Sequence, residues 1–389
     1  MNKIAIITST RAEYGLLQPV LREFRKHESD DLGVFLVVTG THLSEAHGFT
    51  VKEIEEAGDR IDFKIPVGVG SGSAVDIAKN EADTVVKFTE LFEKEKFSTV
   101  VVLGDRYEIL MVALAAVNTS TPIFHIGGGD TTEGAADECF RHSISKMSYL
   151  HFPSNEESRK RIIQLGEAPE RVFNVGATGV DNILNYPLVK SDEVLAELGV
   201  PVRKYAICTY HPTTIGENDI EAEMAGLISA ISEFSDMEFI VTKSNSDLGG
   251  AMINDIWEKA ASTHPNIHLF ASLGMRRYLS LLKNAEFMLG NSSSGIIEAP
   301  AMHIPTVNIG DRQRGRLRSE SILNCRTSKD DIVLAMRKAL SDDMKQTAKE
   351  ADCPFGDGHA AEGIVEQSLK TLKTGIDLKK TFKDITWKS

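Results

Sequence analysis

Residues 99–108 read TVVVLGDRYE, and this stretch decides the class of fold. Its four successive apolar residues, VVVL, do not alternate with polar ones, so both faces of the predicted strand are buried. Strands of that kind occur in parallel sheets that helices cover on both sides. The strand ends in Asp105, Arg106 and Glu108, and consecutive charges at the end of a buried strand indicate that they face a cleft.

Short apolar runs alternate with helical segments on either side of this strand. In the first helical segment Tyr14, Leu17, Leu21 and Phe24 recur at the spacing of one helix face. Strands that alternate with helices form βαβ units, and therefore parallel sheets. The predicted strands are residues 4–8, 34–39, 61–65, 99–103 and 123–126, and then, after a restart near residue 181, 205–209, 238–242, 267–270, 286–289 and 306–309.

The restart predicts an α/β protein with two Rossmann-like, doubly wound domains that face a central cleft. We assign residues 1–180 to the first domain and residues 181–365 to the second, and residues 366–389 to a C-terminal helix and tail that packs back on the first domain. The cleft is expected because most polar clusters follow strands, and open α/β sheets bind ligands outside the carboxyl ends of their strands.

The composition excludes several classes of protein. The chain has 389 residues, of which 42% are hydrophobic, enough for two domains with ordinary cores. The net charge of −13 argues against nucleic-acid binding. Four widely spaced cysteines and a first strand at the very start of the chain predict a cytoplasmic protein with reduced thiols, without a signal peptide or a membrane segment.

Two polar clusters of the first half each have two explanations. Residues 8–13 read TSTRAE, where Ser9 or Thr10 can cap the next helix and Arg11 can reach a phosphate. Taken alone, an ordinary capped turn with a solvated arginine explains this segment better. Asp105 can be an N-cap or a site residue, and the charges beside it favour the site.

A third cluster of the first half is more specific. Residues 127–129 are three glycines after a strand, and they allow the backbone to approach a ligand closely. Asp137 and Arg141 follow on the next helix four residues apart, so they share a face and can pair. A solvated salt bridge would have the same spacing, but the neighbouring ionisable groups favour a site.

In the second half the most informative segment is residues 290–300, GNSSSGIIEAP, which follows a buried strand. We expect it to open a helix whose N–H groups and serines bind a phosphate, with Glu298 one turn inside to accept from sugar hydroxyls. His211 ends another strand, where it can contact a phosphate or move a proton, although a lone histidine is usually structural. The alternate arginines of residues 308–318 fit a diphosphate better than a nucleic acid in so acidic a chain. Residues 243–247 are a weaker candidate near a nucleoside.

These segments together resemble the hydrolysing UDP-N-acetylglucosamine 2-epimerases, in particular the members that act in sialic acid or legionaminic acid biosynthesis. The resemblance covers nearly the whole chain and implies two Rossmann-like domains in the glycosyltransferase-B arrangement. The matching motifs occur in order as TSTRAEYG at 8–15, VTGTHLS at 38–44, LGDRYE at 103–108, DECFRHSISKMS at 137–148, HPTT at 211–214, GNSSSGIIEAP at 290–300 and NIGDRQRGR at 308–316.

The resemblance implies a reaction that uses neither a metal ion nor another cofactor. UDP-N-acetylglucosamine loses UDP from C1 and a proton from C2 to give a glycal, and water then adds with inversion at C2 to release N-acetylmannosamine. Carboxylates would stabilise cationic character at C1, and arginine, histidine and helix N-terminal donors would stabilise the departing diphosphate. The resemblance also implies a homodimer or homotetramer whose partner is the UDP-sugar, with no nucleic acid and no membrane.

Individual roles follow from the same resemblance. The chemistry at the sugar is assigned to Asp105, Asp137, Glu138, Asp130, Arg141 and His211. Binding of UDP is assigned to Arg11, Arg106, His211, Asn245, Ser292, Ser293, Ser294, Glu298 and Arg316, with Glu298 taking the ribose hydroxyls.

One position departs from the pattern of the family. Many relatives have a glutamate immediately after the His-Ile pair that ends a strand, and here that position is Gly127. The role of that glutamate in proton transfer would pass to Asp130, to Glu133 or to water. A small residue here would also admit a bulkier 4-acetamido group, which makes UDP-N,N'-diacetylbacillosamine the alternative substrate.

Three other functions stay open at the level of sequence. A glycosyltransferase of the same architecture would bind the nucleotide in the same way but would need an acceptor pocket. A non-hydrolysing epimerase would interconvert UDP-sugars without releasing UDP. A UDP-sugar sensor would bind the nucleotide without turning it over.

Overall fold

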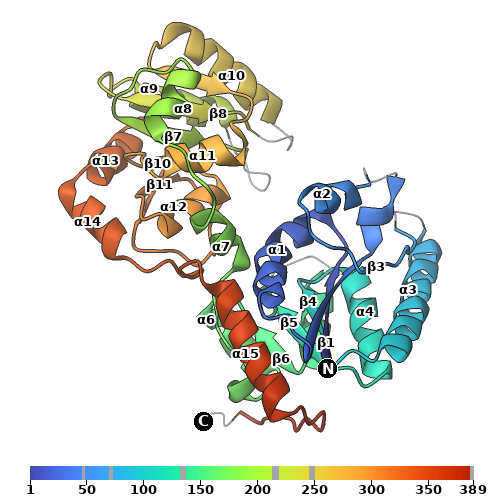
Figure 1. Ribbon diagram of the computed structural model, residues 1–389. Helices are drawn as coiled ribbons and strands as arrows, with labels where there is room; N and C mark the ends of the chain where they lie inside the picture. Colours follow the sequence, from blue (N-terminus) through green and yellow to red (C-terminus); the bar gives the residue numbers. More distant parts are fainter. Residues whose placement is uncertain (46–48, 70–72, 132–136, 213–218, 245–249, 386–389) are drawn as a thin grey trace. The chain divides into compact units, whose positions relative to one another are not determined.

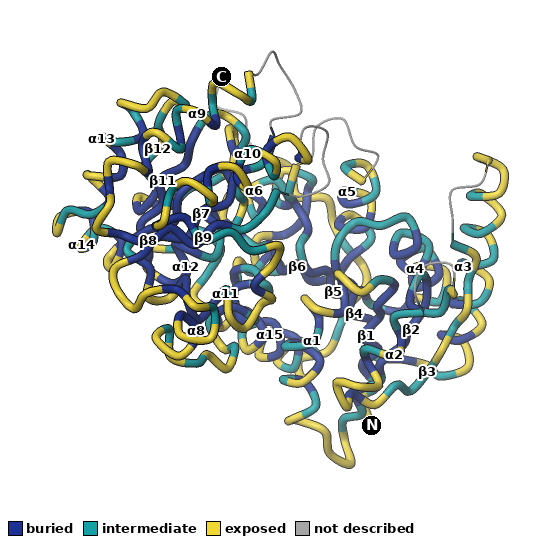
Figure 2. The backbone as a smooth tube through the Cα atoms, turned by 90° about the horizontal axis from the view of Figure 1, so that it is seen from above, coloured by how far each residue is buried: buried dark blue, intermediate teal, exposed yellow. Residues whose placement is uncertain are grey.

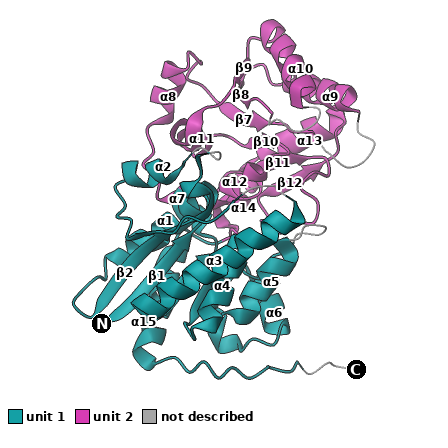
Figure 3. Cartoon of the chain, turned by 90° about the vertical axis from the view of Figure 1, so that its right-hand side faces the viewer, with its two compact units in different colours: residues 1–182, 356–389 teal, residues 183–355 magenta. Residues whose placement is uncertain are grey.

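The computed structural model describes residues 1–45, 49–69, 73–131, 137–212, 219–244 and 250–385 (Figure 1). Two compact units divide the chain, residues 1–182 with 356–389 as unit 1 and residues 183–355 as unit 2 (Figure 3). Each unit contains a six-stranded parallel sheet, which confirms the predicted α/β class with two doubly wound domains. None of the described helices is long and apolar enough to cross a membrane.

Unit 1 has the strand order β3-β2-β1-β4-β5-β6. Its elements are β1 (Asn2–Thr8), α1 (Arg11–Arg25), β2 (Leu32–Val38), the 3₁₀ turn η1 (Gly40–Leu43), α2 (Val51–Glu56), β3 (Phe63–Lys64), α3 (Ala74–Glu95), β4 (Thr99–Leu103), α4 (Tyr107–Asn118), β5 (Ile123–Ile126), α5 (Asp137–Met147), β6 (Leu150–Phe152), α6 (Glu156–Gln164), the 3₁₀ turn η3 (Pro169–Arg171), α7 (Thr178–Leu184), which runs into unit 2, and α15 (Ala360–Thr374).

The sheet of unit 1 is covered on both faces, as its continuous apolar strands predict. Successive residues of a strand point to opposite faces, so Ile4 and Ile6 pack with α1, α2 and α15, whereas Ala5 and Ile7 pack with α3 and α4. Figure 2 shows the strands buried and the outer faces of the helices exposed. The sheet therefore presents only its edges and the loops at its two ends, and a ligand is expected at the loops.

The chain returns to unit 1 through α15, whose N-terminus is capped from far away in the sequence. The buried Asp181 carboxylate accepts from the backbone N–H groups of Ala360 and Ala361, at 3.0 and 2.7 Å. These N–H groups have no partner inside the helix, and the carboxylate also suits the positive end of the helix dipole. This helix begins at Ala360, earlier than the predicted C-terminal segment of residues 366–389, and the stretch 356–365 belongs to unit 1.

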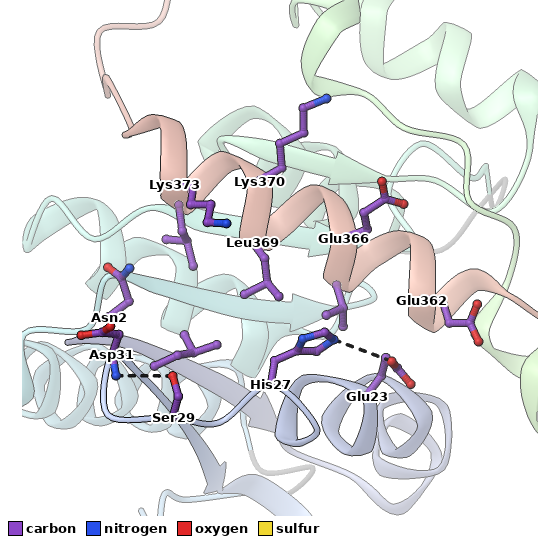
Figure 4. A pocket seen from close by; sticks show the side chains of 13 residues that line it. Asn2, Glu23, His27, Ser29, Asp31, Glu362, Glu366, Leu369, Lys370 and Lys373 are labelled. Carbon is purple, nitrogen blue, oxygen red and sulfur yellow. Dashed lines mark hydrogen bonds and ion pairs between the residues drawn. The ribbon is translucent and has the colours of Figure 1, made fainter.

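A groove of about 870 Å³ opens between α1 and α15 (Figure 4). Figure 4 shows Leu369 directed into this groove, which Glu366 and Lys370 also line. Asn2 and Leu32, which begin β1 and β2, also line it. The groove therefore lies at the amino ends of the strands, the edge opposite to the loops that carry the predicted site residues.

Unit 2 has the strand order β12-β11-β10-β7-β8-β9. Its elements are α8 (Ser191–Glu197), β7 (Tyr205–Thr209), α9 (Ile220–Ile231), β8 (Glu238–Thr242), α10 (Gly250–Thr263), β9 (Ile267–Phe270), α11 (Gly274–Leu282), β10 (Met288–Gly290), the 3₁₀ turn η4 (Ser293–Gly295), α12 (Glu298–Ala301), β11 (Thr306–Ile309), β12 (Ile322–Cys325), α13 (Lys329–Ala339) and α14 (Asp342–Glu350). Helices α9, α10 and α13 pack on one face of the sheet, and α8, α11 and α12 pack on the other.

Two strands escaped the sequence analysis, and both lie at an edge of a sheet. β6 has three residues, and β12 places the exposed Asn324 among partly buried neighbours. An edge strand pairs on one side only and is short, so its apolar pattern is weak. The prediction of ten strands therefore missed one edge of each sheet.

The segment 290–300 differs from its prediction. It does not open one helix; a 3₁₀ turn, η4, is followed by the four-residue α12. Ile297 N–H bonds the Ser293 carbonyl and Ala301 N–H bonds the Ile297 carbonyl, but Pro300 has no N–H to offer Ile296. The missing bond interrupts the helix, so the segment offers the N–H groups of a turn rather than a helix dipole.

Candidate active site

In unit 1 the strand order reverses between β1 and β4, because the chain builds outward to β2 and β3 on one side and to β5 and β6 on the other. Open α/β sheets bind ligands at such a switch point, outside the carboxyl ends of the strands. Residues 9–13 form the loop after β1 and the start of α1, and residues 104–108 form the loop after β4 and the start of α4. Two charged strand ends of the first half are therefore neighbours.

The Glu13 carboxylate accepts hydrogen bonds from the backbone N–H groups at the start of α1. One of its carboxylate oxygens accepts from Ser9 N and Ser9 Oγ, both at 2.8 Å, and from Thr10 N at 3.2 Å. The other oxygen is buried and has no hydrogen bond among the described residues. Burial raises the pKa of Glu13 to about 7, against the hydrogen bonds from Ser9, which lower it. The chain thus supplies its own carboxyl group where a phosphate would sit in a dinucleotide-binding fold.

Arg106 and Glu108 form a forked ion pair beside Glu13. Arg106 donates from Nε and Nη2 to the two oxygens of Glu108, at 3.1 and 2.9 Å, and Glu108 is fully buried. The Arg106 side chain is 41% exposed, so one face of the guanidinium stays open to a ligand. Arg11, in contrast, is exposed and pairs with Glu53 at 2.8 Å.

Arg141 joins the loops after β4 and β5 to its own helix, α5, through one buried guanidinium. It donates to the Asp105 carboxylate from Nη2 and, at 2.9 Å, from Nε. Its Nη1 donates to the Asp130 backbone carbonyl at 2.7 Å and to Glu138 at 3.2 Å. Glu138 also contacts His142, whose Nε2 lies 3.1 Å from its second oxygen. Since Asp105 and Glu138 are only partly buried, two carboxylates are held in fixed positions and remain accessible.

The remaining predicted residues of unit 1 lie around this cluster. The Asp130 carboxylate faces α6, where it accepts from Ser158 Oγ and from Asn155 Nδ2, so it contributes to the cluster through its backbone. Asp137 is exposed at the start of α5, one residue before Glu138. Gly127 has φ +76°, and within the part of the chain that the structure describes a β-carbon built there would meet only Gly104 N, at 3.9 Å.

His125 supports the loop after β4 from inside. Its Nε2 lies 2.8 Å from the Gly104 carbonyl oxygen, and because a carbonyl only accepts, Nε2 carries the proton. Nδ1 then accepts from Ser145 Oγ at 3.1 Å. Burial lowers the pKa of His125 to about 3, so the ring is neutral and fixes the backbone directly before Asp105.

In unit 2 the order reverses between β7 and β10, and the loops after these strands are joined directly. Asn291, after β10, accepts from His211 N at 2.7 Å through Oδ1 and donates to His211 O at 2.8 Å through Nδ2. The His211 ring is further held by Ser244 Oγ, 3.2 Å from its Nδ1. Gly290 makes this approach possible, since at φ +125° a β-carbon would lie 2.0 Å from the Thr209 carbonyl oxygen.

The serine turn and Glu298 form a second polar group beside β10. Ser292 Oγ accepts from Ser294 N at 3.3 Å, Tyr278 and Ser294 share a hydrogen bond through their hydroxyls, and Ser293 is exposed. Glu298 Oε2 is buried without a partner among the described residues, and burial raises the pKa of Glu298. A ligand hydroxyl that donates to Glu298 would satisfy this oxygen and favour the ionised carboxylate.

The arginine segment divides into a structural part and an exposed part. Arg312 and Gln313 donate to the Asn291 carbonyl at 3.1 and 2.8 Å, and so hold the loop after β10. Arg316 is exposed and near them in sequence. Asn245, predicted to lie near a nucleoside, and Glu133 are outside the described residues.

Several residues of these two groups were missed by the sequence analysis. Glu13 had a local signal, because Thr10 and Glu13 have the spacing of a capping box, which the structure contains. Asn291, Tyr278 and His125 had none, since their partners are 80, 16 and 21 residues away. Within the described part of the chain, no group of three or more His, Cys, Asp or Glu side chains is arranged to hold a metal ion.

Comparison with known proteins places these residues in a family. The profile of the UDP-N-acetylglucosamine 2-epimerase family matches residues 24–369. The chain belongs to this family. The resemblance seen in the sequence is thereby confirmed, and this member of the 2-epimerase family carries its polar groups at the switch points of both sheets.

Two hydrolysing relatives match the full length of this family member. It is 38% identical over 387 residues to the GDP/UDP-N,N'-diacetylbacillosamine 2-epimerase (hydrolyzing) of Campylobacter jejuni, across 99% of each chain. It is 36% identical over 373 residues to the UDP-N,N'-diacetylbacillosamine 2-epimerase (hydrolyzing) of Legionella pneumophila, across 96% of each chain. The crystal structure of the UDP-GlcNAc 2-epimerase of Neisseria meningitidis bound to UDP-GlcNAc shares the fold, with a TM-score of 0.77 and 18% identity over 95% of this chain and 100% of that one.

Proposed function

We propose that this family member is a hydrolysing 2-epimerase of a UDP-sugar that carries a second acetamido group, as in UDP-N,N'-diacetylbacillosamine. The observation that carries the proposal is the pair of accessible carboxylates, Asp105 and Glu138, that one buried arginine, Arg141, holds at strand ends. The names of the two hydrolysing relatives favour this substrate over UDP-N-acetylglucosamine, which the sequence analysis put first.

The proposed reaction has two steps. In the first, a carboxylate removes the proton from C2 of the sugar while the C1–O bond breaks, and UDP leaves with the bonding electrons. The electrons of the C2–H bond form the C1–C2 double bond of a glycal. In the second, the oxygen of water bonds to C1 and a proton returns to C2 on the opposite face, which gives the free 2-epimer. Asp105, Asp137 and Glu138 supply acid, base and negative charge.

Arg141 would hold the carboxylates that act in the first step. Because its guanidinium contacts both Asp105 and Glu138, a fixed positive charge lies between the two carboxylates. They can therefore sit close together and still face the cationic character that develops at C1. Arg106 has an exposed face and would neutralise the departing phosphate.

Unit 2 would bind the nucleotide. Glu298 has a buried oxygen that lacks a partner among the described residues and would accept from the ribose hydroxyls. The hydroxyls and N–H groups of residues 292–294, with Arg316, would take the phosphates, and His211 would contact the diphosphate as UDP leaves. The link between Asn291 and His211 holds that imidazole where β7 and β10 end.

The place of the second acetamido group is proposed at Gly127. Among the described residues, a β-carbon there would have only the Gly104 backbone nitrogen within 4 Å, so the space beside Gly104 is open on the described side. The φ of +76° also disfavours the glutamate that many relatives have. The open space supports a substrate with a bulkier substituent at C4.

The proposal is tested by proton NMR of the protein with each UDP-sugar in deuterium oxide. We expect free UDP and a 2-epimer with deuterium at C2, and a kcat/KM for the diacetylated sugar at least about tenfold above that for UDP-N-acetylglucosamine, the difference that one well-fitted group can supply. A higher kcat/KM for UDP-N-acetylglucosamine would reverse the choice of substrate. An epimerised UDP-sugar without free UDP would identify a non-hydrolysing enzyme.

Matched variants separate chemistry from binding. Asp105→Asn removes one carboxylate charge with little change of shape, and we expect turnover to fall by roughly 100-fold or more while UDP still binds. Asp31→Asn makes the same change at an exposed position at the amino end of β2 and is expected to leave turnover intact. UDP binding with no turnover by the wild-type protein would indicate a sensor.

A further inference from the structure

A buried charge cluster lies at the end of α5 that is remote from Glu138 and Arg141. The Glu167 carboxylate, 1% exposed, accepts from Lys146 Nζ at 2.8 Å on one oxygen and from Lys380 Nζ at 2.7 Å on the other. His151 Nε2 lies 3.2 Å from the second oxygen. A buried carboxylate is stable only when it is paired, so each of these partners matters for the local structure.

Lys380 comes from the tail that follows α15, more than 200 residues away from its partners. Its ammonium also donates to the backbone carbonyls of Lys146 and Ser148, at 2.9 and 2.5 Å. Lys146 is in the last turn of α5, and Ser148 directly follows the helix. The last carbonyls of a helix have no partner inside it, so a cation is favourable at this position. One side chain thus closes the C-terminus of α5 and neutralises Glu167.

Two neighbouring contacts show that the tail is seated along this surface rather than joined at one point. Phe382 lies against Lys146, whose Nζ is 4.7 Å from the ring centroid. Lys383 N donates to the Gly166 carbonyl at 2.9 Å. Gly166 leaves room for the Phe382 ring, because a β-carbon at this position would lie 2.5 Å from a carbon of the ring. Figure 3 shows the tail running from α15 past α6. We call residues 380–383 the strap.

The helix that the strap holds is the one that carries the candidate catalytic groups. Glu138 and Arg141 lie in the first turns of α5, Ser145 bonds His125 near its end, and Lys146 is in the last turn. Lys146 and Arg141 are five residues apart in this 11-residue helix, about 7.5 Å along its axis, and the backbone hydrogen bonds of the helix connect them. A displacement at the strap would therefore shift Arg141 from Asp105.

We propose that Lys380 is a positioning residue: the strap holds the C-terminal end of α5 and so keeps the Arg141 guanidinium on Asp105. The effect on turnover rests on the proposed function, whereas the effect on α5 does not. Displacement of catalytic groups by about 1 Å can lower a rate by roughly 100-fold, so even a small shift of α5 is measurable.

The test compares Lys380→Met with Lys380→Arg, which restores the charge, and with Lys379→Met, which makes the same change at an exposed neighbour. Hydrogen exchange of residues 142–148 is measured by mass spectrometry, together with kcat, KM and the Kd for UDP. For Lys380→Met we expect faster exchange in this peptide and a kcat lower by roughly 10-fold to 100-fold, with KM and the UDP Kd within about twofold. Lys380→Arg is expected to recover most of the kcat.

Phe382→Ala loosens the strap without touching the charges and is expected to increase exchange at 142–148 in the same direction. Exchange and kcat unchanged in Lys380→Met would overturn the proposal, as would a loss confined to UDP affinity. If the wild-type protein turns over neither UDP-sugar, the proposed function fails, and the exchange of residues 142–148 still decides whether the strap holds α5.

Discussion

Replacing Glu13 with glutamine is expected to remove a pH-dependent loss of stability from unit 1. Burial raises the pKa of this carboxyl from 4.5 to about 7 in the folded chain. The folded state therefore holds a proton between these pH values that the unfolded state has released. The free energy of unfolding then falls as the pH rises through this window, and it stays low above about pH 7.

The structure sets the size of this effect. A difference of about 2.5 pK units at about 1.4 kcal/mol each corresponds to about 3 kcal/mol between the acidic and the alkaline limit. A glutamine keeps a carbonyl oxygen for the N–H groups of Ser9 and Thr10 but never ionises. Any cost of the altered hydrogen bonds is independent of pH. The change of the free-energy difference between variant and wild type with pH therefore reports only on the ionisation of Glu13.

The measurement needs a probe within unit 1. Trp257 is buried in the core of unit 2, so its fluorescence follows the other unit. Hydrogen exchange of residues 4–17, corrected for the intrinsic rate at each pH, reports on β1 and α1 directly. We expect the stability of Glu13→Gln relative to wild type to increase by roughly 2–3 kcal/mol from about pH 5 to about pH 8, most of the full difference. Glu93→Gln, which alters an exposed carboxylate paired with the exposed Lys96 at the end of α3, is expected to show no such trend.

A difference between Glu13→Gln and wild type that is constant over this range would refute the reasoning. It would mean that water or a charge reaches the carboxyl in solution and keeps its pKa near that of an ordinary glutamate. If instead Glu13→Gln loses stability relative to wild type as the pH rises, the hydrogen bonds stabilise the carboxylate more than burial destabilises it.

Three further predictions concern unit 2. Gly290→Ala is expected to lower the free energy of unfolding of unit 2 by about 3 kcal/mol or more, because its β-carbon would lie 2.0 Å from the Thr209 carbonyl oxygen. Urea unfolding followed by Trp257 fluorescence measures this loss. A loss below about 1 kcal/mol would show that the loops after β7 and β10 can separate. Asn291→Asp replaces the amide that donates to His211 O with an acceptor, and calorimetry should show UDP binding weakened by roughly tenfold, whereas unchanged affinity would remove His211 from the nucleotide site. Glu298→Gln should weaken UDP by roughly tenfold and 2'-deoxy-UDP by less, and an equal loss for both would argue against a ribose contact.

Local sequence was sufficient for the class of fold and for most strands. Continuous apolar runs such as residues 99–103 need two covered faces, and this requirement holds wherever the strand lies in the sheet. The prediction of strands from apolar runs missed β6 and β12, because each lies at the edge of its sheet and its apolar run is short. Local sequence also failed at Pro300, whose missing N–H interrupts the expected helix.

The candidate site was predicted in part because strand ends are visible in a sequence. Asp105, Arg141, His211 and Glu298 were all singled out from the residue types that follow strands. Their partners were not visible, because Asp105 and Arg141 are 36 positions apart and His211 and Asn291 are 80 positions apart, and only the pairing of strands brings them together.

The sequence by itself determined that two parallel sheets form and that charged groups stand at their carboxyl ends, because hydrophobic period and turn residues act over a few positions. Only the tertiary structure decided which strand ends are neighbours, that Glu13 is buried with a raised pKa, and that Lys380 reaches Glu167. These depend on strand order and on packing between distant segments. Burial and electrostatic coupling are properties of the assembled neighbourhood, and no local pattern of residues contains them.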